Sequence, residues 1–139
     1  MIPKFRFFGK VADGEMRMVL ADCIDFKNKF VYYNYHVYTV EGGDHEYGDV
    51  IGFDDIILMQ STGLLDKNGK EVFEGDVVIA LSQGVKGIFE IKRRIDGLLF
   101  LYPAGKDGQF WYLSPTEDGR ETIEIIGNIY ENHELLGGK

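Results

Sequence analysis

The segment GGDHEYGD, residues 42–49, gathers four side chains that can bind a metal ion: Asp44, His45, Glu46 and Asp49. Carboxylate oxygens and imidazole nitrogens are ordinary ligands of divalent cations. Neighbours in sequence seldom converge on one ion, however, and the other two histidines do not stand at the spacing of a zinc pair. Because the segment has no apolar period, it predicts a solvated loop, and a metal-dependent enzyme using the acidic 44–49 loop is one alternative function.

The stretch LLDKNGKEVFEGDVV, residues 64–78, holds a second dense set of polar residues. A calcium loop beginning at Asp66 would place Lys70 at a ligand position, where an ammonium group repels the ion. A phosphate-binding loop needs a hydroxyl residue after its glycine-lysine pair, but a glutamate follows Lys70. Two tight turns explain the composition instead: Asn68-Gly69 is a strong hairpin signal, and Glu74-Gly75-Asp76 makes a second corner.

Basic residues gather later in the chain, at Lys86, Lys92, Arg93 and Arg94. Aromatic residues follow nearby in the sequence: Tyr102, Phe110, Trp111 and Tyr112. Small barrels bind single strands by stacking bases on exposed aromatic rings beside a basic groove, so this set predicts a nucleic-acid site as a further alternative. In the competing interpretation the aromatic rings fill the core and the charges keep an edge strand soluble. A formal net charge of -8 argues against broad binding to a polyanion.

Acidic residues dominate a different part of the chain. No Lys or Arg occurs between Lys29 and Lys67, and seven carboxylates fall in or at the edge of that gap: Glu41, Asp44, Glu46, Asp49, Asp54, Asp55 and Asp66. One face of the protein is therefore expected to be acidic and another locally basic, which is an indication about docking rather than catalysis.

Composition bounds the class of protein. A chain of 139 residues with ten Phe, eight Tyr and 18 Gly can form a core without a disulfide and favours short strands joined by tight turns. The single cysteine, Cys23, cannot form an intrachain disulfide, and we expect it to be buried or half-buried. No apolar run reaches the roughly 20 residues that span a bilayer, and the start lacks the features of a signal peptide, so the expected location is the cytoplasm.

The N-terminal part reads as β-structure. Asp13-Gly14 predicts a hairpin between strands at Lys4–Val11 and Glu15–Ala21. The run CIDFKNKFVYYNYHVYTV is rich in β-branched and aromatic residues; as one extended strand it places Val31, Tyr33, Tyr35 and Val37 on one face, and a turn at Asn34 is the alternative. We interpret FDDIILMQ as a strand. In the alternative interpretation it forms a single helical turn, with Asp54 or Asp55 as its N-cap.

The C-terminal part predicts a small, strongly bent antiparallel barrel, SH3-like in style, made of five short strands. The expected strands are DVVIAL, IFEIKRRI, LLFLY, FWYL and TIEIIGNIY, with loops at Pro103–Gln109 and PTEDGRE. We expect Phe89, Ile91 and Ile95 to face the core, Asp96-Gly97 to form a hairpin, and Gly127 to mark a bulge. Asn132 is the expected N-cap of a short C-terminal helical turn.

These elements predict one domain, 1–139, composed of an N-terminal β lobe at about 1–57 and a C-terminal small barrel at about 58–139. No repeat, linker or low-complexity tract interrupts the chain. The acidic segment at 42–48 is the one place where the sequence could divide the chain into two lobes.

Several short motifs together resemble the YopX family of phage- and prophage-encoded proteins. They are the start KFR, the segment Gln60-Ser61-Thr62-Gly63, the Asn68-Gly69 turn, Glu74-Gly75-Asp76 and the run IGNIYEN at 126–132. The chain departs from the family pattern at Phe7-Phe8-Gly9, where an aromatic-acidic pair is common, and at His133, where proline is common. The resemblance implies a mostly-β protein made inside an infected or lysogenic cell and supplies no catalytic residue.

The family pattern also includes the polar cluster Gln60, Ser61 and Thr62, whose side chains either hydrogen-bond to backbone at a strand end or bind a ligand. No cofactor is expected. The leading hypothesis is a non-enzymatic phage or prophage accessory protein that binds another macromolecule, copies of itself included. Single-stranded nucleic-acid binding and metal-dependent catalysis are the alternatives, and no membrane partner is expected.

Overall fold

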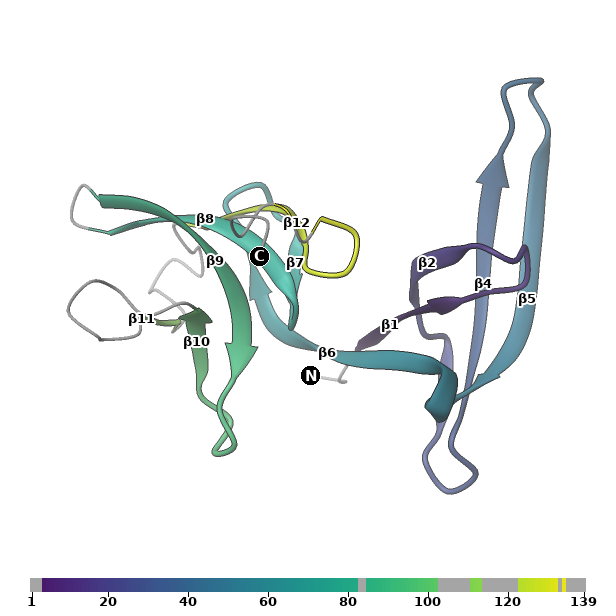
Figure 1. Ribbon diagram of the computed structural model, residues 1–139, viewed down its shortest axis with the longest axis horizontal. Helices are drawn as coiled ribbons and strands as arrows, with labels where there is room; N and C mark the ends of the chain where they lie inside the picture. The colour runs from purple at the N-terminus through teal and green to yellow at the C-terminus, as the bar shows by residue number, and fades with distance from the viewer. Residues whose placement is uncertain (1–3, 83–84, 103–110, 114–122, 133, 135–139) are drawn as a thin grey trace. The chain divides into compact units, whose positions relative to one another are not determined.

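The computed structural model describes residues 4–82, 85–102, 111–113, 123–132 and 134. Within these ranges the chain forms twelve β-strands and one short 3-10 helix (Figure 1). The prediction of a mostly-β protein is therefore confirmed. No helix in the described ranges has the length and apolar character that a membrane span requires.

The chain divides between Gln60 and Ser61 into two compact units. The first unit is Ile2–Gln60 and the second unit is built from Ser61–Lys139. The predicted boundary after residue 57 falls inside a strand, β6 (Ile56–Leu65), whose two halves belong to different units. The single domain of the sequence analysis stays a prediction, and each unit is described by itself.

One sheet of the first unit is centred on β1 (Phe5–Lys10), which pairs with β2 (Met16–Leu20) on one side and with residues 56–60 of β6 on the other. The predicted hairpin at Asp13-Gly14 is confirmed. Gly14 has a φ of +86°, a conformation that glycine adopts without steric cost.

The other sheet of the first unit has the order β3-β4-β5 among the described strands. Its strands are β3 (Cys23–Asp25), β4 (Phe30–Tyr38) and β5 (Asp44–Gly52), and β4 pairs with β5 over its whole length (Figure 1). Apolar side chains of both sheets form one core: Phe7, Val11, Val19, Val31 and Tyr33. The predicted inward face of Val31 and Tyr33 is thereby confirmed, because both are at most 3% exposed.

Two turns in this region differ from the sequence prediction. Asn34 lies inside β4 rather than in a turn, so the alternative hairpin there was wrong. The chain reverses instead between Asp25 and Lys29, whose φ of 63° is unusual for a residue with a side chain. The Asp25 carboxylate stabilises this turn by accepting hydrogen bonds from the backbone and side-chain nitrogens of Asn28, at 2.9 and 2.8 Å.

The predicted loop at residues 44–49 is also wrong, because these residues form the first part of β5. Most of their side chains are exposed on both faces of the strand, so no apolar alternation marks it in the sequence. Pairing with β4, rather than burial of one face, makes this segment a strand.

The 3-10 turn Phe53–Asp55 precedes β6. Its N-cap is Gly52, and no side chain among the described residues caps it, so Asp54 and Asp55 are not the caps proposed in the alternative interpretation. The favoured strand follows directly, at Ile56.

The second unit begins with residues 61–65 of β6, which pair with β7 (Glu71–Phe73) through the hairpin at Asn68-Gly69. Gly69 has a φ of +82° and Gly75, at the next corner, a φ of +87°. Both predicted turns are confirmed.

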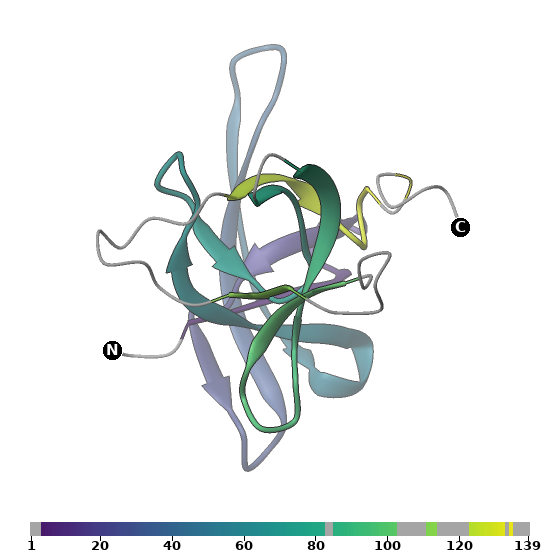
Figure 2. The ribbon, with the colours of Figure 1, turned by 90° about the vertical axis from the view of Figure 1, so that its left-hand side faces the viewer.

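The rest of the second unit is an antiparallel sheet with five strands within the described ranges, in the order β11-β10-β9-β8-β12. The strands are β8 (Asp76–Ser82), β9 (Val85–Arg93), β10 (Leu99–Tyr102), β11 (Trp111–Leu113) and β12 (Ile123–Asn128). The sheet curls into a half-barrel (Figure 2), as the prediction of a strongly bent sheet requires. The likeness to an SH3 barrel stays a prediction.

Buried apolar residues of this sheet and of β7 form the core cluster of the second unit: Val72, Val78, Ala80, Ile91, Leu101 and Ile123. The predicted inward position of Ile91 is confirmed, with Phe89 packed against the same cluster. Ile95 is fully exposed, contrary to prediction, because the turn between Arg94 and Leu98 carries it out of the strand.

The end of the described chain agrees with one further prediction. The β8–β12 register shifts between Ile125 and Gly127, which is the expected bulge. A turn follows β12, in which Asn132 N donates to Asn128 O at 2.8 Å. The predicted helical turn begins after Asn132, where Glu134 is the one residue within the described ranges. Asn128 Oδ1 caps the turn by accepting from the backbone nitrogens of Tyr130 and Glu131, at 3.0 and 2.9 Å. The predicted loops at Pro103–Gln109 and at 115–121 lie outside the described residues.

Candidate binding surface

The outward side of strands β9, β10 and β11 carries an exposed mixture of cations and aromatic rings. Side chains alternate along a strand, so the buried residues Ile91, Leu99 and Leu101 leave their neighbours on the opposite side. We call this side the β9–β11 outer face; its members are Lys86, Ile88, Glu90, Lys92, Phe100, Tyr102 and Tyr112, with Arg94 at the end of β9. Tyr102 is 44% exposed and Tyr112 is 50% exposed.

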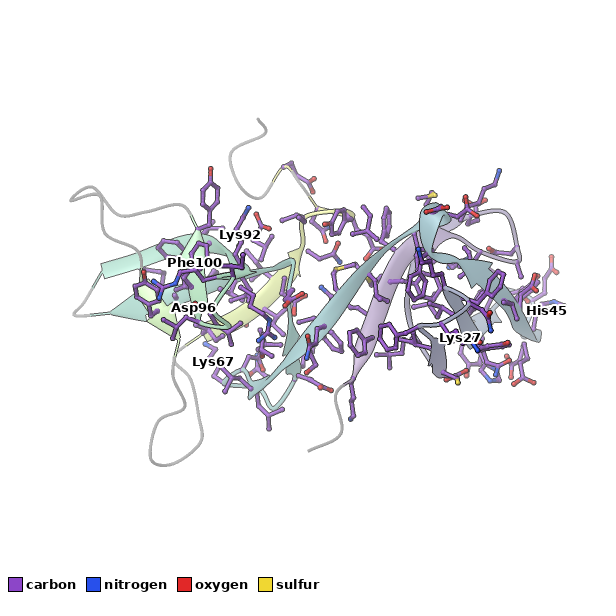
Figure 3. All side chains as sticks on the ribbon, turned by 90° about the horizontal axis from the view of Figure 1, so that it is seen from below. Lys27, His45, Lys67, Lys92, Asp96 and Phe100 are labelled. Atoms are coloured by element: carbon purple, nitrogen blue, oxygen red, sulfur yellow. The ribbon has the colours of Figure 1, made fainter. Side chains whose placement is uncertain are left out.

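Lys92 and Phe100 are neighbours on the β9–β11 outer face (Figure 3). Lys92 stands opposite Phe100 in the β9–β10 register, and its Nζ lies 4.7 Å from the centroid of the Tyr102 ring. Phe100 in turn lies opposite Tyr112, with 6.4 Å between ring centroids. An ammonium group over an aromatic face is attracted by the ring quadrupole, so Lys92 and the two tyrosines form one continuous cation–aromatic patch.

Arg94 extends this patch and is held in place. Its Cζ lies 5.5 Å from the Tyr112 ring centroid, and its NH1 group donates to Tyr112 Oη at 3.1 Å. Its Nε donates to Asp96 Oδ1 at 2.9 Å, while NH2 pairs with the other oxygen of Asp96. Hydrogen bonding from Arg94 lowers the pKa of Asp96 to about 2, and the same contact raises the pKa of Arg94. The guanidinium group is thus oriented before any partner arrives, but its charge is largely compensated.

Arg93 points to the other side of the strand. It forms an ion pair with Glu74, and its NH2 group donates to the backbone oxygen of Ser61 at 3.3 Å. The structure therefore separates the predicted basic set: Lys86, Lys92 and Arg94 share one face, whereas Arg93 fastens the Glu74 corner to β6.

Glu90 is the acidic member of the β9–β11 outer face. It is half-buried between Val77 and Tyr102 in the strand register. Burial raises the pKa of Glu90, and the charge of Lys92 acts in the opposite direction. Together with Asp96, Glu90 reduces the positive charge that this surface presents.

The four metal candidates of the sequence analysis do not converge on one point. Asp44 and Glu46 share a face of β5, and His45, near the tip of the β4–β5 hairpin, lies on the other face because side chains alternate along a strand. Asp49 also lies on the other face, and its Oδ1 accepts a hydrogen bond from Val50 N at 2.8 Å.

His36 contacts this segment, although no local sequence signal connects the two. Its Nδ1 lies 3.0 Å from Asp44 Oδ1 and its Nε2 lies 3.8 Å from Glu46 Oε2. Because the two carboxylates approach opposite nitrogens of the ring, they do not face a common ion. Across the described part of the chain, no group of three His, Cys, Asp or Glu side chains is arranged to hold a metal. The pairing of His36 with Glu46 depends on the β4–β5 register, which local sequence does not reveal.

The polar cluster Gln60, Ser61 and Thr62 lies where β6 passes from one unit to the other. Thr62 Oγ1 donates to Val72 O at 2.7 Å and accepts from Leu64 N at 3.1 Å. Ser61 Oγ donates to Glu71 and accepts from Gly63 N at 3.1 Å. These bonds replace ladder bonds at the irregularity between Ser61 and Leu65, so the side chains of Ser61 and Thr62 both have structural partners.

A groove with a volume of about 590 Å³ lies on the first unit. Its lining includes Phe5, Leu20, Ile24 and Phe26, and Leu20 and Phe26 are 58% and 61% exposed. Cys23 also lines it and is exposed, so the prediction of a buried or half-buried cysteine was wrong. Cys23 stands opposite Tyr32 on the outward side of β4, which explains its exposure.

Comparison with known proteins places these features in a family. The family model described as "YopX protein" matches residues 4–137. Among solved structures, the crystal structure of protein EF1440 from Enterococcus faecalis is similar, with 27% sequence identity over 98% of this chain and 99% of that chain and a TM-score of 0.51. No curated protein matches the chain.

Proposed function

The chain belongs to the YopX family, and from that premise we propose that it is a phage- or prophage-encoded accessory protein that acts by binding another macromolecule rather than by catalysis. Its place of action is the cytoplasm of the bacterial host cell. The partner is a protein, and a second copy of this chain is one such partner.

The exposure of Tyr102 and Tyr112 beside Lys92 and Arg94 is the observation that supports this proposal most. Tyrosine and arginine are enriched in protein interfaces. A tyrosine ring contributes a large, rigid contact area at a small cost in conformational entropy, and an arginine costs less entropy when it is already held in place before binding. Here the aromatic rings stand on a sheet, and Arg94 is fixed by Asp96. Binding of a partner would therefore cost little conformational entropy, because these side chains are already held in place.

Recovery of partners from infected or lysogenic cells tests the proposal. Tagged wild-type protein is compared with Tyr102→Ala/Tyr112→Ala, and with Tyr38→Ala as a control that removes a 77% exposed tyrosine from the first unit. We expect a partner to be recovered with the wild type and the control and lost with the double variant. Recovery of no partner under gentle conditions, or equal recovery with the double variant, contradicts the proposal.

Single-stranded nucleic acid is the second candidate partner, and the Lys92–Tyr102 pair favours it. A base can stack on a ring while the adjacent ammonium group contacts phosphate. Arg93 no longer belongs to this candidate site, because its side chain pairs with Glu74.

Binding of a labelled oligonucleotide at several salt concentrations tests this candidate. We expect affinity to fall as salt rises, and Lys92→Ala to reduce the slope of log K against log salt by about 1. If the protein does not bind the oligonucleotide, or if its affinity does not depend on salt, single-stranded nucleic acid is excluded as the partner.

Metal-dependent catalysis by the 44–49 segment is the third alternative. The separation of Asp44 and Glu46 from His45 and Asp49 gives it no support. Elemental analysis of the purified protein together with a calorimetric metal titration would reinstate it if they detected a stoichiometric, tightly held ion.

A further inference from the structure

Strand β5 lies at the edge of the β3-β4-β5 sheet, and among the described residues its far side has no strand partner. The strand is nine residues long, and six of its first seven residues are exposed. A strand edge of this length offers a row of backbone donors and acceptors to any extended chain that approaches it.

Two backbone hydrogen bonds show which groups of β5 face outward. At the hairpin tip Thr39 N donates to Gly43 O at 2.8 Å, and at the base Phe53 N donates to Lys29 O at 3.0 Å. In an antiparallel ladder the bonded pairs alternate with non-bonded pairs. With the observed register, the odd-numbered residues of β5 bond to β4. The even-numbered residues direct their N–H and C=O groups to the open side: Asp44, Glu46, Gly48 and Val50.

One of these outward donors is already occupied. Val50 N donates to the carboxylate of Asp49 at 2.8 Å. Within the described part of the chain, this leaves the backbone of Asp44, Glu46 and Gly48 as a continuous open segment, and all three residues are exposed.

The open segment is held by a rigid support. Tyr33 and Tyr35 stack with 5.9 Å between ring centroids, and Tyr35 stacks on Tyr47 across the β4–β5 pair at 5.3 Å. Gly48 lies under the side chain of Asn34, whose Oδ1 would be 2.2 Å from a Cβ at that position. The edge is therefore pre-ordered, which lowers the entropy that a bound strand would cost.

Charge selects what this edge accepts. The chain contains no Lys or Arg between Lys29 and Lys67. The side chains of Asp44 and Glu46 are 50% and 64% exposed on one face, and Asp49 lies on the other. A second copy of β5 would bring like charges opposite one another, which is destabilising, whereas a strand with Lys or Arg at alternate positions would meet opposite charges.

We infer that the open side of β5 binds an extended, basic segment of a partner protein by strand addition, with main-chain hydrogen bonds to Asp44, Glu46 and Gly48. This surface is separate from the β9–β11 outer face and does not depend on it. The inference assigns the acidic segment a docking role in place of metal binding.

Amide exchange measured by NMR on the whole protein tests the inference. The probe is a synthetic peptide of about eight residues, long enough for one strand, with lysine and valine alternating. On binding, the amides of Glu46 and Gly48 should become protected, while those of His45 and Tyr47, already bonded to β4, should change little. A peptide that binds without protecting Glu46 and Gly48 would overturn the inference, and so would the absence of binding.

Two matched variants separate the edge from simple charge attraction. Asp44→Lys/Glu46→Lys and Asp54→Lys/Asp55→Lys each replace two negative charges by two positive ones, so both change the net charge from -8 to -4. We expect the first to weaken binding by about tenfold or more and the second to leave it nearly unchanged. Equal weakening by both variants contradicts the inference.

A change in the peptide backbone tests the hydrogen bonds directly. N-methylation of alternate residues keeps the lysine charges but removes the donors along one edge of the peptide. Methylation of one alternating set should abolish binding, and methylation of the other set should preserve it. If both methylated peptides bind as well as the parent, the contact is not strand addition and the inference fails.

Discussion

Asp66, at 1% exposure, accepts a hydrogen bond at Oδ2 from the backbone nitrogen of Ile125, which is 3.0 Å away and 59 positions later in the chain. Its Oδ1 accepts from Asn68 N and Lys70 N, each at 2.9 Å. A backbone bond from Lys67 N to Ile123 O runs beside it at 2.9 Å. One buried carboxylate thus closes the Asn68-Gly69 hairpin and fixes β12 against it.

Replacing Asp66 by alanine should destabilise the protein by about 3 kcal/mol, because it leaves three backbone N–H groups without their charged acceptor. Urea unfolding followed by circular dichroism measures the change. Asp54→Ala, which removes an exposed carboxylate, is the control and should stay within about 0.5 kcal/mol of wild type. A loss at Asp66 no larger than that of the control would refute the anchoring role.

Acidification should lower the stability of the folded state. Hydrogen bonding from Arg17 lowers the pKa of Asp13 to about 2, and Arg94 does the same for Asp96. The pKa of Asp66 is also lowered. Burial acts to raise it, but the hydrogen bonds that the carboxylate accepts from three backbone nitrogens have the larger combined effect. A lowered folded-state pKa contributes stability above the unfolded value of about 4 and loses it as pH falls toward the folded value.

The urea midpoint should therefore decrease between about pH 5 and pH 2. Asp13→Asn should show a shallower decrease, because one of the shifted carboxylates is absent. A midpoint that does not change over this range contradicts the prediction.

Glu90→Gln should stabilise the protein at neutral pH. Burial raises the pKa of Glu90, so its contribution to stability is present when it is protonated and is lost as pH rises through the folded-state pKa. Glutamine keeps the shape without the charge. The urea midpoint of the variant should exceed that of wild type at pH 7, and the difference should vanish near pH 3, where the unfolded glutamate is also protonated. Glu15→Gln, at an exposed position, serves as the control and should change the pH 7 midpoint little.

Gly9→Ala should cost about 1–3 kcal/mol, since an added Cβ would lie 2.8 Å from Ile56 Cγ2 and 3.0 Å from the backbone oxygen of Asp55. The backbone oxygen cannot move without disturbing the β1–β6 pairing. Gly52→Ala is the matched control, because its nearest neighbour atom would be 3.8 Å away. Equal unfolding free energies for the two variants would contradict the prediction, because they would show that β1 and β6 can move apart to accommodate the added methyl group at little energetic cost.

Local turn chemistry made much of the fold predictable. Asp13-Gly14, Asn68-Gly69 and Asp96-Gly97 each place a glycine where φ is positive, and each joins two paired strands. Such signals act over two residues and need no knowledge of the rest of the chain.

Other features depend on partners that sequence does not display. Strand β5 has no alternation because neither face is fully covered, so its conformation follows from β4. The turn at Asp25–Lys29 contains no glycine, and Lys29 itself adopts the positive φ. Neither strand β5 nor the turn at Asp25–Lys29 could be predicted, because each is stabilised by hydrogen bonds to particular partners that residue types do not identify.

The candidate surface was predictable in part. Alternation along β9 indicates that Lys92 and Arg94 point outward, and the structure agrees. Arg93 could not be assigned, because Glu74 and Ser61 lie 19 and 32 positions earlier. The charge of Arg94 is compensated by Asp96, so the number of basic residues in the sequence overstates the positive charge of this surface.

Strand β6 restricts how relatives of this chain can change in length. Residues 56–60 keep register with β1 and residues 61–65 with β7. Inserting or deleting one residue there would exchange the two faces of the strand. The hairpin tip between Tyr38 and Asp44 has no such constraint, so evolutionary gain and loss of residues should accumulate at that tip and spare β6.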